Sequence, residues 1–202
     1  MGEEDKYLET VPTQTQGSKM DIVEKRSAKS INESILIYEN AVRKLLTINK
    51  WGDFAGISAF QLIDADGVRA ERLARENDFI RIDIPGPGTL AGMGYDWVRI
   101  EKIVTIDDEN NQLISMTVRP SAHPVAGNGE TAHFLKDVAT STFIVRRIGL
   151  DIFAEEHGRN ELANTDQGSF FDKGRNFTVG IAAKLGLSYP QWKNLVKGLL
   201  KD

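Results

Sequence analysis

Residues 79–84 of the chain read Phe-Ile-Arg-Ile-Asp-Ile, so an isoleucine stands at every second position with a charged residue between neighbours. This period of two is typical of a half-buried β-strand, because successive side chains point to opposite faces of a sheet. The pattern returns further along the chain, at Val98, Ile100, Val104, Ile106, Ile114, Met116, Val118, Phe143 and Val145. Most of residues 57–161 are therefore predicted to form sheet strands.

The connections between these strands are short and carry turn residues. Segments 64–67, 107–111 and 147–149 contain Asp, Asn or Gly and suit β-hairpins. A parallel crossover needs a dozen or more residues, so short connections require antiparallel pairing. The predicted sheet is an antiparallel meander of five to seven strands.

A helix is predicted before the sheet, after a short strand near residues 20–25. Ser30 and Glu33 form a capping box, in which the serine hydroxyl and the glutamate carboxylate satisfy free amides at a helix start. Apolar residues follow at spacings of three and four, namely Ile31, Ile35, Tyr38, Val42 and Leu45. This spacing predicts an amphipathic helix that ends near Asn49.

The end of the chain returns to a helical pattern. Phe170, Phe177, Ile181 and Leu185 share one helical face, and Gly186 is a typical helix terminator. A second capping box at residues 188–191 starts a new helix, whose apolar stripe is Trp192, Leu195, Val196 and Leu199.

This order of elements resembles the START-like superfamily, also called the helix-grip or Bet v 1-like fold. The resemblance covers roughly residues 20–200, and its closest local matches are residues 30–34, Trp51 and residues 79–84. It implies an α+β fold in which a curved antiparallel meander wraps around a C-terminal helix, with one N-terminal amphipathic helix. Members commonly enclose an apolar cavity and bind lipids, sterols or polyketide-type compounds, and a minority are enzymes. The sequence departs from the pattern at residues 186–188, where the C-terminal helix is predicted to be broken.

Composition narrows the class of protein. The 202 residues are 41% hydrophobic and 27% charged, as in an ordinary globular domain. We expect a flexible lead-in over residues 1–19 and a single domain over residues 20–202. The absence of cysteine excludes disulfides, thiolate zinc sites and a cysteine nucleophile. The net charge of −4 gives no attraction to nucleic acid, and no apolar run suits a signal peptide or a membrane span, so we expect a cytoplasmic protein.

The densest polar feature is residues 157–161. If a strand runs through them, His157, Arg159 and Glu161 project to one face. One hypothesis is general acid–base catalysis, with His157 paired to Glu161 or to Asp96. The alternative is a cross-strand ladder of ion pairs.

Two loops carry the remaining candidates. Residues 85–97 hold four glycines but no lysine, which disfavours nucleotide binding and suggests a lid over a pocket mouth lined by Tyr95 and Trp97. His123 and His133 flank a second loop without the spacing of metal ligands, so neither a metal site nor a cofactor is expected.

Three functions stay open. The leading hypothesis is a binder of a small apolar or lipid-like molecule between the sheet and the C-terminal helix. Its candidate ligand-binding residues are Tyr95, Trp97, Arg119, His133, His157, Arg159, Phe177 and Ile181. The second is an enzyme acting on a small hydrophobic substrate through the acid–base pair described above. The third is a protein-interaction module built on Phe170, Phe171, Tyr189 and Trp192, and a homo-oligomer also stays open.

Overall fold

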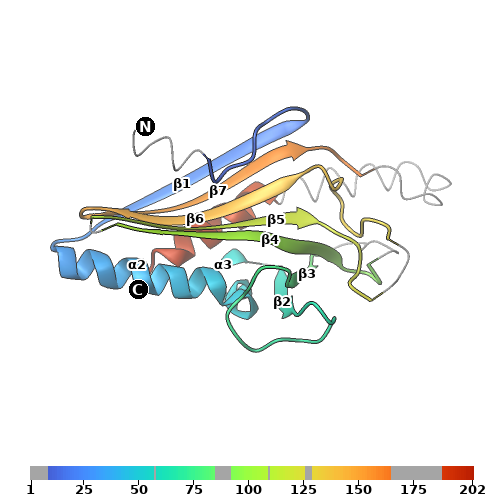
Figure 1. Cartoon of the computed structure of the whole chain (residues 1–202), viewed down its shortest axis with the longest axis horizontal. Coiled ribbons are helices and arrows are strands. Elements are labelled where there is room, and N and C mark those ends of the chain that lie inside the picture. The colour runs from blue at the N-terminus through green and yellow to red at the C-terminus, as the bar shows by residue number, and fades with distance from the viewer. Residues whose placement is uncertain (1–8, 57, 85–91, 109, 126–128, 165–187) are drawn as a thin grey trace.

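The computed structural model describes residues 9–56, 58–84, 92–108, 110–125, 129–164 and 188–202. Within these residues a seven-stranded antiparallel sheet is flanked by helices (Figure 1). The strands are β1 (Ser18–Ser27), β2 (Ala59–Ile63), β3 (Phe79–Asp83), β4 (Asp96–Asp107), β5 (Asn111–Pro120), β6 (Thr140–Ile148) and β7 (Asp151–Glu161). The helical elements are α2 (Ile31–Leu46), the 3-10 turn η1 (Ile48–Lys50), α3 (Gly52–Ala55) and a C-terminal helix over residues 188–199.

The strand order is β1-β7-β6-β5-β4-β3-β2. Strands β2 to β7 therefore follow one another as neighbours, and β1 is added beside β7, where Ser27 pairs with Asp151 and Ser18 with Glu161. Every pairing is antiparallel, which confirms the predicted meander.

Helix α2 begins where the capping box predicts. The hydroxyl of Ser30 accepts a hydrogen bond from the Glu33 amide at 3.2 Å, and the Glu33 carboxylate accepts one from the Lys29 amide at 2.6 Å. The helix ends at Leu46, three residues before the predicted end, because Thr47 leaves the helical conformation, with φ −92° and ψ 69°, and the chain continues as η1.

The helices pack on one face of the sheet, which we call the inner face. Tyr38 and Leu45 of α2 join the main core, as do Leu195 and Leu199 of the C-terminal helix (red in Figure 1). The predicted apolar stripe of this last helix is therefore confirmed. Two parts of the helical prediction lie outside the described residues. They are the predicted break, of which only Ser188 is described, and the face formed by Phe170, Phe177, Ile181 and Leu185.

Strand β1 extends two residues beyond each end of the predicted strand at residues 20–25. It begins at Ser18, and the residues before it contact β7: the Thr15 amide donates to Asn160 Oδ1 at 2.7 Å. The turn at residues 64–67 joins only a short hairpin, in which Ile63 and Arg69 pair antiparallel, and the next strand begins at Phe79. The Asp64 carboxylate closes the turn, and a bidentate ion pair between Arg72 and Asp78 then holds the rest of a longer loop.

No helix in the described part of the chain is long and apolar enough to cross a membrane.

Candidate functional site

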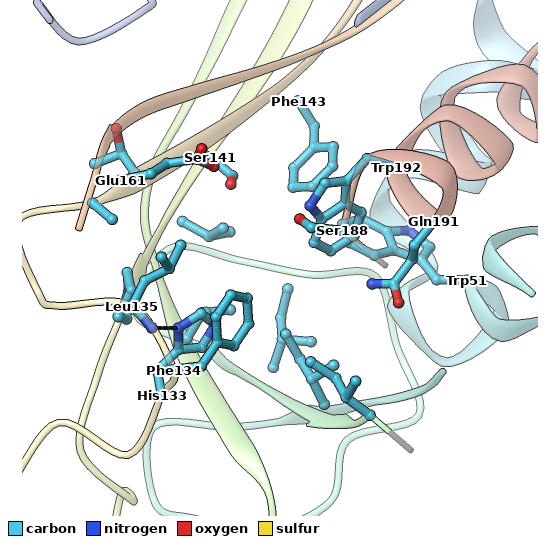
Figure 2. Close-up of a pocket in the computed structure, with 18 residues that line it drawn as sticks. Trp51, His133, Phe134, Leu135, Ser141, Phe143, Glu161, Ser188, Gln191 and Trp192 are labelled. Atoms are coloured by element: carbon cyan, nitrogen blue, oxygen red, sulfur yellow. Dashed lines mark hydrogen bonds between the residues drawn. The ribbon is translucent and has the colours of Figure 1, made fainter. Parts of the chain in front are cut away.

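A pocket lies between the inner face of the sheet and the C-terminal helix (Figure 2). The atom-free space within it, counted with its opening to solvent, is about 680 Å³. The centre of a water molecule can occupy about 40 Å³ of that space. The alternation that predicts strand β3 also explains the wall, because Ile80, Ile82 and Ile84 all point inward and line the pocket.

An aromatic cluster forms one wall of the pocket. The rings of Phe143 and Trp192 meet edge to face with their centroids 5.2 Å apart, and Trp51 lies 4.9 Å from Phe143. Trp51 is fixed in place because its indole Nε1 donates to the carbonyl of Leu45 at 3.0 Å. These contacts build a rigid apolar surface from β6, the C-terminal helix and the connection between η1 and α3.

Polar groups stand at two further places on the wall. Gln191 of the C-terminal helix accepts a hydrogen bond from the hydroxyl of Ser58. His133 stacks on Phe134 at 4.4 Å, and its Nδ1 accepts from the Leu135 amide at 3.0 Å. In a neutral His133 ring the proton is therefore on Nε2.

Glu161 and Ser141 lie on the opposite side of the pocket from Trp51 and Gln191 (Figure 2). A bulge between β1 and β7 brings Glu161 there, since the register shifts at this end of the pair and Asn160 has a φ of 56°. The carboxylate then folds over Gly158: a Cβ atom at position 158 would lie 2.6 Å from Glu161 Oε1. A larger residue at position 158 would therefore displace the end of the Glu161 side chain from this place.

This bulge makes one prediction wrong. His157, Arg159 and Glu161 do not share a face, because the irregular backbone at Asn160 turns Glu161 to the inner side. His157 instead bonds through Nδ1 to Asp21 at 2.6 Å and through Nε2 to Glu155 at 2.8 Å.

The contacts of His157 belong to a cross-strand ladder of charges, the predicted alternative. Arg146 donates to Glu155 at 2.6 Å, and Arg159 donates to Asp21 at 2.6 Å, so two arginines flank the two carboxylates. The ladder is more buried than expected, since Glu155 has no exposed surface. Burial by itself lowers the pKa of His157, but its bonds to Glu155 and Asp21 outweigh burial and raise it.

Glu156 points away from this ladder, into the inner face. It is fully buried, and neither carboxyl oxygen has a hydrogen-bond partner of good geometry among the described residues. Burial raises the pKa of Glu156 well above its ordinary value, and the nearby charge of Glu161 raises it further, although the neighbouring Ser141 hydroxyl partly offsets both effects. Burial also raises the pKa of Glu161.

Asp96, the other predicted partner of His157, is engaged elsewhere. It is buried at the start of β4 and accepts a hydrogen bond from the Phe134 amide at 3.1 Å. The structure therefore brings neither predicted carboxylate to the ring of His157.

Of the predicted ligand-binding residues, His133 lines the pocket, whereas Phe177 and Ile181 lie outside the described residues. The others face different surroundings. Trp97 belongs to a separate small cluster, where its indole Nε1 donates to the Gly92 carbonyl at 3.1 Å. The Tyr95 ring lies under the guanidinium of Arg81 at 4.3 Å. Arg119 donates to Glu101 at 2.6 Å, and Arg159 is held in the ladder.

The other predicted sites are only partly described. Residues 85–91 of the predicted glycine-rich lid lie outside the described residues. Phe170 and Phe171 of the predicted interaction surface also lie outside them. Tyr189 of that surface is exposed, whereas Trp192 faces the pocket. Where the chain is described, no group of three or more His, Asp or Glu side chains is placed to hold a metal ion.

Sequence reasoning missed Glu156 and Trp51. A signal for the first exists in the consecutive pair Glu155-Glu156, because two neighbours on one strand cannot face the same side and one carboxylate must turn toward the core. No local signal exists for Trp51, whose place in the wall depends on contacts with β6 and with the C-terminal helix.

Comparisons with known proteins give similarity only at the level of structure. No family model matches the chain, and no match was found among curated proteins. Among solved structures, the hypothetical protein jhp0584 from Helicobacter pylori has a TM-score of 0.50 at 7% identity, over 90% of this chain and 88% of that one. Norcoclaurine synthase from Thalictrum flavum has a TM-score of 0.35 at 10% identity, over 93% and 98% of the two chains. An aromatase/cyclase from Streptomyces has 0.38 at 9% identity, over 90% and 94%.

The strand order and the helix packed on the sheet identify the architecture. The chain has the helix-grip, Bet v 1-like fold, as the resemblance in the sequence implies.

Proposed function

We propose that the protein binds a small, largely apolar organic molecule in the pocket between the sheet and the C-terminal helix. The observation that carries this proposal is the pocket itself, in which an aromatic wall faces a few polar groups. Ligand sites in proteins typically combine these two features, since apolar walls supply affinity and a few polar groups orient the ligand.

The size of the pocket limits the ligand. The cavity volume of about 40 Å³ lies well below the roughly 300–1,000 Å³ of typical ligand sites. A water needs roughly 10–15 Å³ of such space, so the cavity admits about three waters. The ligand is therefore small, or the side chains of the wall move when it enters.

Native mass spectrometry and ligand-observed NMR test this proposal. The purified protein is first examined for a bound molecule, and cyclohexylmethanol is then added as a compact apolar probe. Two of the three tryptophans, Trp51 and Trp192, line the pocket, so binding is also expected to change intrinsic fluorescence.

A pair of matched variants locates the binding. Val118→Phe adds bulk to the pocket wall, whereas Val104→Phe makes the same change at a half-buried position of β4 outside the lining. We expect the first variant to lose probe binding and the second to keep it, with the fold of each checked by circular dichroism. Absence of any bound molecule together with failure of the wild-type protein to bind the probe would overturn the proposal.

A further inference from the structure

One end of the pocket carries two carboxyl groups that form no ion pair with any described residue, although the Ser18 hydroxyl donates to Glu161 at 3.3 Å. Glu161 lines the pocket, and Glu156 lies on the same face of β7 with Gly158 between them. Because Gly158 has no side chain, the Glu161 carboxylate lies over it on the inner face. Gly158 is two residues from Glu156, and such positions on one face are roughly 7 Å apart, so one small cationic group can reach both carboxylates.

The arginine nearest to these carboxyl groups is already committed. Arg159 donates to the carbonyls of Met20 and Gly158 at 3.0 and 2.7 Å and to the Asp21 carboxylate. Among the described residues, Glu156 and Glu161 form no ion pair. A fully buried carboxyl without a partner is costly, and proteins keep such groups paired or neutral.

A second observation is the state of the Glu156 carboxyl. Both of its oxygens are buried and have no hydrogen-bond partner of good geometry among the described residues. Glu161 and Ser141, on the same face, line the pocket opposite the side that carries Trp51 and Gln191 (Figure 2).

We infer that the ligand of this pocket is an amphiphilic amine, whose ammonium group binds between Glu156 and Glu161 while its apolar body contacts the aromatic wall. This inference rests on the proposed function. A metal ion fits the site less well, because two carboxyl groups supply too few ligands for the six or more oxygens that calcium takes.

Binding of the amine is coupled to release of a proton. Burial favours the protonated form of Glu156 in the free protein. When the ammonium ion enters, that proton passes to solvent and the resulting carboxylate accepts a hydrogen bond from the N–H group. The charged groups that influence Glu156 are Glu161, Asp21 and Arg159. The other groups facing it are uncharged, with Ile22 opposite on β1 and Phe143 and Ser141 on β6.

Three probes of matched shape test the inference: cyclohexylmethylamine, cyclohexylmethanol and cyclohexanecarboxylate. At pH 7.5, calorimetry is expected to show the amine binding at least about tenfold more tightly than the alcohol, as suits charge-assisted hydrogen bonds in a buried site. The carboxylate is expected to bind worst. Repeating the amine titration in buffers of different ionisation enthalpy is expected to show proton release.

Variants separate the carboxyl groups from the rest of the pocket. Glu156→Gln and Glu161→Gln are expected to reduce the preference for the amine over the alcohol to less than about threefold, while Glu39→Gln on the exposed face of α2 changes neither affinity. Thermal melts confirm that each variant is folded. Equal binding of amine and alcohol to the wild-type protein, or a preference that survives in the double variant, would refute the amine inference while leaving the pocket proposal intact. Failure of all three probes to bind refutes both.

Discussion

The substitution Glu156→Gln is expected to change how the stability of the protein depends on pH. In the folded state, burial and then the charge of Glu161 raise the pKa of this carboxyl above its ordinary value of 4.5. Between those two values the folded protein keeps a proton that the unfolded chain has released. Glutamine has nearly the same shape but no proton to lose, so it isolates the effect of ionisation.

The sign follows from proton linkage. The stabilising contribution of a raised carboxyl pKa is fully present below pH 4.5 and is lost as pH rises toward the pKa of the folded state. Over that interval the wild-type protein loses about 1.4 kcal/mol per pH unit relative to the variant. For a chain of this length, 1 kcal/mol shifts the melting temperature by about 2–4 °C, which corresponds to about 3–6 °C per pH unit.

Thermal and urea unfolding of both proteins between pH 4 and pH 8 measures this difference. We expect similar stability at the acidic end and an increasing advantage for the variant as pH rises, with Glu39→Gln as a control for loss of an exposed carboxylate. Because His157 also has a raised pKa, only the difference between the two curves is informative. Parallel curves from pH 5 to pH 8 would show that Glu156 is not held in an unpaired, buried state.

Three further predictions concern stability and titration. Trp51→Ala removes a fully buried ring from the aromatic wall and is expected to cost about 3–5 kcal/mol in urea unfolding; a loss below 1 kcal/mol would contradict its central position. Gly198→Ala is expected to destabilise the protein by about 1–3 kcal/mol although alanine favours helices, because the new Cβ would lie 2.5 Å from Phe54 Cβ, and a rise in melting temperature would exclude this close contact. The imidazole of His157 is expected to titrate above 6.5 by NMR and to shift down in Asp21→Asn. The stability that protonated His157 contributes should be present below pH 6.5 and lost as pH rises through the folded pKa. An unchanged His157 titration in Asp21→Asn would refute the role of Asp21.

Much of the fold is predictable because its signals are local. The alternation in residues 79–84 and the short connections are enough to predict antiparallel strands, and the capping box places the start of α2 correctly. The loop after β2 was not predictable from its turn at residues 64–67, because the position of the next strand depends on a contact between Arg72 and Asp78 further along the chain.

The candidate site was less predictable, since it depends on contacts distant in sequence. His133 was expected in the pocket, and the same alternation that predicts β3 determines which isoleucines face inward. The position of Glu161 was not foreseeable, because the bulge that turns it inward is held by residues far away: Asn160 accepts from the Thr15 amide, and its own amide donates to Gln14. A period-two pattern assumes a regular strand and fails where such a contact bends one.

The pairing of β1 with β7 has a consequence for synthesis of the protein. Ser18 and Glu161, which meet in this pair, are 143 residues apart. At the usual translation rate of about 5–20 residues per second, the ribosome needs roughly 7–30 s to make the partner of β1 after β1 itself. During that time the backbone N–H and C=O groups of β1 have no β7 to pair with, and they can bond to edge strands of other chains, which is a known route to aggregation. We therefore expect the sheet to be completed only after β7, its last strand to be synthesised, pairs with β1, its first.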